Sequence, residues 1–158
     1  MVSDVEAAPG LARARERALP AFSVPRAASE SRSSHEARIL RILEDARPDL
    51  VCLAGYMRVL SPDFVARYRG RILNVHPSLL PRYRGLFPQR RALEAGESVA
   101  GCTVHVVDEG TDTGPVVVQR TVPIEPADTE ETLSARILAG EHEAYPEAIA
   151  RVLEGLGR

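Results

Sequence analysis

The sequence contains no lysine, so every positively charged side chain is an arginine. This absence excludes enzymes that form a Schiff base on a lysine side chain. No stretch reaches the roughly 18 consecutive apolar residues that a membrane-spanning helix needs. The N-terminus also lacks a positively charged segment followed by an apolar one, which is the pattern of a secretory signal. We therefore expect a cytoplasmic protein that has no membrane partner.

Cysteine is scarce, because only Cys52 and Cys102 occur. Both lie in apolar stretches and neither belongs to a C-x-x-C spacing, so two buried free thiols are favoured over a disulfide. No cluster of Cys and His has the spacing of a metal site, and we expect no metal. The net charge of −2 gives no global attraction to nucleic acid, which we exclude as a partner.

With 158 residues, of which 44% are hydrophobic, the chain is long enough to bury a core. Its length fits a single domain over residues 1–158. Strand and helix patterns alternate in the first two thirds, which predicts an α/β fold with a mostly parallel sheet. In such sheets, binding sites lie at the carboxyl ends of strands.

Local signals place the expected elements. Ser33 and Glu36 have the spacing of a capping box, and they predict a helix that Pro48 stops. Ser61 followed by Pro62 predicts the start of another helix. Strands are expected over residues 49–54, 71–76, 102–107 and 116–124. Two further helices are expected, one over residues 88–95 and one from a cap at Asp128 to near the C-terminus. Pro146 should kink this last helix or begin a new one.

Asn74 and His76 are two residues apart on an expected strand. The two-residue period of a strand places both side chains on one face, about 7 Å apart along the backbone. An amide that donates hydrogen bonds beside an imidazole that can donate or accept a proton suits acyl transfer. The spacing alone fits equally well a strand end with two polar side chains that face water.

Asp112 lies in a turn rich in glycine, DEGTDTGP, over residues 108–115. A carboxylate close to His76 would stabilise the imidazolium and orient its ring. An aspartate in such a turn also serves ordinary turn geometry, and sequence spacing leaves both alternatives open.

A longer motif surrounds these residues. The run NVHPSLLPRYRG over residues 74–85 resembles the N-x-H-P-S-L-L-P-x-x-x-G signature of folate-dependent formyltransferases. LAGYMRVL precedes it over residues 53–60, and DTGP follows it over residues 112–115. The segment TVHVVDE over residues 103–109, together with Gln119, Glu141 and His142, resembles the phosphoribosylglycinamide formyltransferase branch.

The resemblance implies a Rossmann-like formyltransferase fold and a role for particular residues. It implies that Asn74, His76 and Asp112 are catalytic, and that the co-substrate is 10-formyltetrahydrofolate. It implies formyl transfer to phosphoribosylglycinamide in de novo purine biosynthesis, and it allows a homodimer. The residues that it assigns to folate binding are Arg32, Met57, Arg58, Val59, Leu60, Asn74 and His105, and the residue that it assigns to substrate binding is Glu141.

Each assignment has a structural alternative. Met57, Val59 and Leu60 would otherwise pack in the core, and Arg32 and Glu141 would otherwise be solvated surface charges. His105, among valines on an expected strand, would otherwise be a core histidine. Between Arg58 and Arg91 stand eight arginines and one acidic residue, a charge that favours anionic substrates or simply forms a solvated face.

The resemblance also implies a first strand and a phosphate-binding loop ahead of Val2, and the sequence shows no such segment. We therefore expect a fold that lacks the first strand and the phosphate loop, and that is slightly shortened at the C-terminus. Two alternative functions are left open. One is a formyltetrahydrofolate hydrolase, and the other is a folate-binding protein with impaired catalysis.

Overall fold

The computed structural model describes residues 1–157, and the chain divides into two compact units, Met1–Pro48 and Asp49–Arg158. The two units have separate sheets, one of two strands and one of four. The expectation of a single domain over residues 1–158 stays a prediction. No helix among residues 1–157 is both long and apolar enough to cross a membrane.

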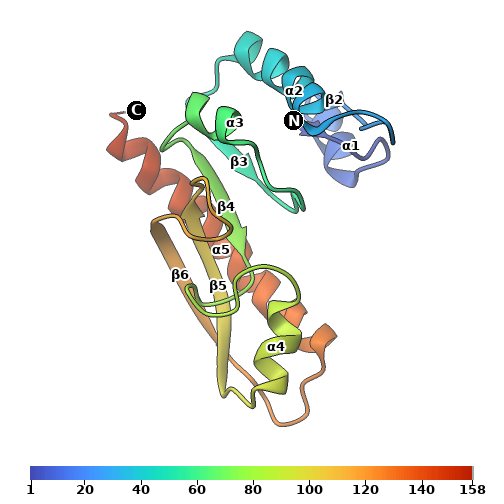
Figure 1. Ribbon diagram of the computed structural model, residues 1–158. Helices are drawn as coiled ribbons and strands as arrows, with labels where there is room; N and C mark the ends of the chain where they lie inside the picture. The colour runs from blue at the N-terminus through green and yellow to red at the C-terminus, as the bar shows by residue number, and fades with distance from the viewer. Residues whose placement is uncertain (158) are drawn as a thin grey trace. The chain divides into compact units, whose positions relative to one another are not determined.

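The first unit contains two strands and two helices (Figure 1): β1 (Val2–Ser3), α1 (Pro9–Glu16), β2 (Phe22–Ser23) and α2 (Arg32–Ala46). β1 and β2 pair in parallel. The sequence analysis did not anticipate α1, although proline stands in its first turn and Leu11 and Ala14 are spaced to share one buried face. The expected lack of a first strand and a phosphate loop ahead of β1 stays a prediction.

The start of α2 differs from the expected one. Ser31 caps the helix, with its hydroxyl oxygen accepting a hydrogen bond from the Ser34 amide at 3.1 Å. The predicted cap at Ser33 is therefore wrong, because three serines within four residues offered competing caps and the chain uses the earliest. The helix ends at Ala46, just before Pro48, as predicted.

The second unit has a four-stranded sheet with the order β3-β4-β5-β6. Only β3 and β4 pair in parallel, whereas β4–β5 and β5–β6 are antiparallel. The prediction of a mostly parallel sheet is wrong for this unit, because an alternation of strands and helices does not specify the direction in which a strand returns. The elements are β3 (Val51–Leu53), α3 (Pro62–Arg67), β4 (Ile72–His76), α4 (Pro88–Glu94), β5 (Val99–Val106), β6 (Val116–Pro123) and α5 (Glu130–Gly155).

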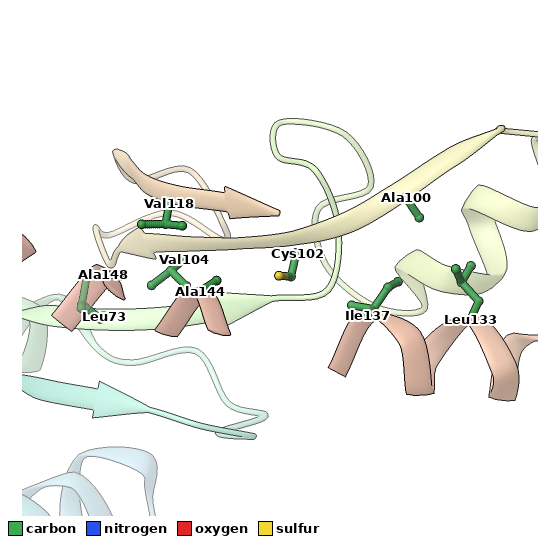
Figure 2. Packing of buried hydrophobic residues seen from close by; sticks show 9 residues of the cluster. All are labelled: Leu73, Ala100, Cys102, Val104, Val118, Leu133, Ile137, Ala144 and Ala148. Atoms are coloured by element: carbon green, nitrogen blue, oxygen red, sulfur yellow. The ribbon is translucent and has the colours of Figure 1, made fainter. Parts of the chain in front are cut away.

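The core of this unit lies between the sheet and α5 (Figure 2). Cys102 and Val104 of β5 alternate with residues that point to the other face, and both are fully buried against the helix. Leu133, Ile137, Ala144 and Ala148 form the buried stripe of α5. The long helix therefore covers one face of the sheet and leaves the other face for different contacts.

α5 begins one residue later than predicted. Thr129 is the cap and forms a capping box with Thr132. Asp128, the predicted cap, instead binds Arg136 with both carboxylate oxygens. Pro146 lies inside the helix, which continues through it as one element.

The expectation that Cys52 is buried is wrong. Its strand, β3, lies at one edge of the four-stranded sheet, and Cys52 is an exposed free thiol, while Cys102 is buried as expected. The continuous apolar run predicted a strand covered on both faces, but apolar composition alone does not locate a strand within its sheet.

Candidate active site

The uncovered face of the sheet carries a group of polar side chains. The antiparallel register pairs Asn74 with His105 and His76 with Thr103. Residues that are directly opposite in a sheet share a face, and each strand alternates. All four side chains therefore lie on the face opposite the one that α5 covers, at the carboxyl end of β4.

His76 is 5% exposed and has an oxygen close to each ring nitrogen. Its Nε2 donates to the carbonyl oxygen of Tyr83 at 3.0 Å, and its Nδ1 lies 3.4 Å from Oδ2 of Asp112. A carbonyl oxygen and a carboxylate both accept hydrogen bonds. The surroundings of His76 therefore suit the imidazolium, which has a hydrogen on both nitrogens.

Asp112 reaches the histidines from the turn between β5 and β6. Its backbone is left-handed, with φ of 53°, a conformation that aspartate and asparagine adopt more readily than most residues. Its Oδ2 accepts a hydrogen bond from the Gly85 amide at 2.9 Å. Burial acts to raise the pKa of Asp112, but the interactions with His105, the Gly85 amide and His76 outweigh it and lower the pKa below its ordinary value. The carboxylate is thus held in its charged form.

His105 links the other two members of the group. Its Nε2 lies 3.3 Å from Nδ2 of Asn74 and 3.6 Å from Oδ1 of Asp112. Its Nδ1 is 3.1 Å from the carbonyl oxygen of Val106. With 2% exposure it is buried, and the two side chains that its Nε2 faces both belong to the polar group.

Thr103 and Gln119 fix the segment that follows His76, a role that the sequence analysis did not assign to them. The Thr103 hydroxyl donates to the Ser78 carbonyl at 2.6 Å and accepts from the Leu80 amide at 3.0 Å. Gln119 donates to the Leu80 carbonyl at 2.8 Å and to the Thr103 hydroxyl at 2.9 Å. Thr103 is a polar residue directly opposite His76 in the sheet, and this placement was the available signal. It could be recognised only once the register between β4 and β5 was known.

The arrangement brings an amide N–H, a histidine between two acceptors and a charged carboxylate into one cluster. Such a set can stabilise a developing oxyanion and move a proton, which are the needs of acyl transfer. Within residues 1–157, no three His, Cys, Asp or Glu side chains are grouped so that they could hold a metal ion.

The chain matches the formyl transferase family over residues 1–149. It is 42% identical to the phosphoribosylglycinamide formyltransferase of Escherichia coli over 146 residues, which cover 92% of this chain and 69% of that protein. The chain belongs to the phosphoribosylglycinamide formyltransferase family. The solved glycinamide ribonucleotide transformylase 1 of Symbiobacterium toebii has the same formyltransferase fold, with a TM-score of 0.94, 49% identity, and coverage of 98% of this chain and 73% of that chain.

Some formyltransferase relatives are much longer than this chain. It is 51% identical to the trifunctional purine biosynthetic protein adenosine-3 of Drosophila melanogaster over 146 residues. That match covers 92% of this chain and 11% of the fly protein. The chain therefore spans about one ninth of that relative's length.

The other residues that the formyltransferase resemblance singled out lie in several places. Between β3 and α3, Met57 and Val59 are 78% and 53% exposed, so neither packs in the core, whereas Leu60 is buried. Arg58 is also exposed. Arg32 is an exposed residue at the start of α2, in the first unit.

Glu141 lies on α5, on the side of the sheet opposite the histidines. Burial raises the pKa of its carboxyl group, and the charge of His142 opposes this only in part. Burial and the negative charge of Glu141 together raise the pKa of the Cys102 thiol to about 11. The role assigned to Glu141 stays a prediction.

The arginine-rich stretch is partly neutralised by acidic residues from other elements. Arg69 pairs with Glu109 at 3.0 Å, and Arg90 pairs with Glu130 at 3.0 Å. Arg82 pairs with Glu97. The net positive charge counted along the sequence therefore overstates the charge at the surface.

Proposed function

We propose that the chain transfers the formyl group of 10-formyltetrahydrofolate to the amine of phosphoribosylglycinamide, a step of de novo purine biosynthesis. The observation that carries the proposal is the convergence of Asn74, His76 and Asp112 on one face of the sheet, with the His76 ring 3.4 Å from the carboxylate. The family of the chain supports the choice of substrates.

In the proposed mechanism the neutral amine attacks the formyl carbon, and a tetrahedral intermediate forms. The negative charge that develops on the formyl oxygen is stabilised by N–H groups of His76 and Asn74. The Nε2 hydrogen of His76 is now directed at the Tyr83 carbonyl. The formyl oxygen would take the place of that carbonyl, which requires residues 82–85 to shift.

The intermediate collapses as the bond between the formyl carbon and N10 of the folate breaks. The attacking amine loses one proton, and N10 gains one. Asp112 keeps His76 charged and helps to carry this proton through water, a role that the lowered pKa of Asp112 supports. Loss of its charge would leave His76 less able to act as a hydrogen-bond donor.

Residues outside the cluster would bind the two substrates. We assign the exposed segment 57–59 and the buried Leu60 to the pterin ring. This segment follows the carboxyl end of β3, which pairs with β4 at Asn74, and its exposed apolar side chains offer a surface for an aromatic ligand. His105 would line the folate site. The roles of Arg32 in folate binding and of Glu141 in binding the glycinamide amine stay predictions from the resemblance alone, since Arg32 lies in the first unit and the helix of Glu141 covers the other face of the sheet.

A turnover assay tests the proposal against its two alternatives. The purified chain is given 10-formyltetrahydrofolate with and without phosphoribosylglycinamide, and formate and formylated product are both measured. Product that depends on the amine supports formyl transfer. Formate released at the same rate without the amine identifies a hydrolase. Folate binding by calorimetry without either product identifies a binding protein and overturns the proposal.

A further inference from the structure

The hydrogen bonds of His105 fix where its ring hydrogen lies. Its Nδ1 is 3.1 Å from the Val106 carbonyl oxygen, which can only accept, so Nδ1 carries the hydrogen. Its Nε2 faces the Asn74 amide nitrogen at 3.3 Å, and that nitrogen can only donate. With the Asn74 amide in this orientation, Nε2 is the atom that accepts this hydrogen bond.

The carboxylate of Asp112 is consistent with this assignment. Its Oδ1 lies 3.6 Å from the same Nε2, beyond hydrogen-bond distance. Its Oδ2 accepts a hydrogen bond from the Gly85 amide and lies 3.4 Å from Nδ1 of His76. The shorter of the two histidine contacts of Asp112 is therefore the one with His76.

We propose that neutral His105 is a positioning residue that sets the orientation of the Asn74 amide. Nδ2 of Asn74 has two hydrogens, and one of them donates to His105. This holds the NH₂ group toward the site and leaves the second hydrogen for the formyl oxygen. Without the acceptor at Nε2, the amide can rotate by about 180° and present its carbonyl oxygen, which repels a developing oxyanion.

The inference rests on the proposed function for its kinetic consequence, but its structural part can be measured separately. Long-range ¹H–¹⁵N correlation spectra of the full chain report which ring nitrogen of each histidine carries hydrogen. We expect His105 to be neutral with the hydrogen on Nδ1 near neutral pH. A hydrogen on Nε2 overturns the proposal, whether or not the chain turns over.

Two substitutions separate the two nitrogens of the ring. His105→Gln places an amide near the position of Nε2 and can still accept a hydrogen bond from Asn74. His105→Asn places an amide near Nδ1, which keeps the contact with Val106 and loses the acceptor. We expect kcat to fall at least about tenfold in His105→Asn, and to fall several-fold less in His105→Gln.

A double-mutant cycle shows whether His105 acts through Asn74. In an Asn74→Ala background, His105→Asn should lower kcat by less than about twofold, because the amide that it orients is gone. Full additivity of the two losses, or equal activity of the Gln and Asn variants, overturns the proposal. Absence of formyl transfer by the unmodified chain would instead reject the proposed function and leave the tautomer measurement to decide the inference.

Discussion

The two faces of the sheet in the second unit are built by the same strands and have opposite compositions. One face of β4 and β5 presents Leu73, Cys102 and Val104 to α5, and all three are fully buried. The other face presents His76, Thr103 and His105, which are also almost fully buried, yet each has polar partners. Burial alone therefore does not distinguish the core from the site, whereas hydrogen bonding does.

The comparison predicts a separation of effects. Substitutions on the face toward α5 should cost stability, because they leave cavities in a packed interior. Substitutions of the polar cluster should cost turnover, because the cluster is organised for a charge that develops only during reaction.

The largest effect is expected for His76→Ala. Loss of one oxyanion donor lowers kcat by roughly 100-fold to 1000-fold, and the free energy of unfolding should change much less. Steady-state kinetics and urea denaturation of the same preparation measure both quantities. Thr121→Ala, an exposed position on the same face of β6, is the matched control and should keep full activity. Unchanged turnover in His76→Ala would remove His76 from the mechanism.

Leu73→Ala tests the opposite face of the same strand. Its side chain is fully buried against the core around α5, so the substitution should lower the free energy of unfolding by about 2 to 5 kcal/mol. Val99→Ala, at a position that is 43% exposed, is the control and should cost much less. A small loss of stability in Leu73→Ala would show that α5 does not pack as tightly on the sheet as the contacts indicate.

Asp112→Asn tests the carboxylate that lies close to both histidines. Asparagine tolerates the left-handed backbone at this position, so the substitution removes charge without backbone strain. The pKa of Asp112 is lowered in the folded chain, so the carboxylate stabilises the fold above the unfolded pKa of about 3.9. This contribution is lost as the pH falls through the folded pKa.

The expected difference in the free energy of unfolding between the unmodified chain and Asp112→Asn is about 1.5 to 3 kcal/mol above pH 5, and it shrinks at lower pH. Urea denaturation over a pH series measures it. Glu109→Gln, in the same turn but more than half exposed, should change stability by about 1 kcal/mol or less at every pH. A difference that grows toward acid pH would mean that the carboxylate is not stabilised as its contacts imply.

The sequence was informative where one element decides the outcome. The spacing of Asn74 and His76 predicted a shared face, and the pairing with His105 and Thr103 confirms it. Ser61 before Pro62 predicted the start of α3, and Ser61 does cap that helix at 3.2 Å. Two-residue periodicity and helix caps depend on local geometry, which neighbouring residues determine.

The sequence was less informative where distant segments meet. The 3.4 Å contact between His76 and Asp112 depends on the turn between β5 and β6 folding back over β4, which no spacing specifies. The antiparallel direction of β5 has the same origin, and so does the position of Cys52 on an edge strand. Pairing direction and strand order are tertiary properties, so the pattern of apolar residues left them undetermined.

The smallest effect concerns the helix that covers the apolar face. Thr129→Ala removes the cap of α5, whose hydroxyl accepts from the Thr132 amide at 3.2 Å, and should cost about 1 kcal/mol of folding stability with no change in kcat.

The neighbouring Asp128 is not the cap, but its carboxylate pairs at 2.6 Å with Arg136, which lies further along α5. Salt separates the two residues, because screening weakens an ion pair and leaves a neutral cap hydrogen bond almost unchanged. In denaturation series with rising salt, the deficit of Asp128→Asn should therefore shrink while that of Thr129→Ala persists; equal salt dependence would assign the start of α5 to Asp128 after all.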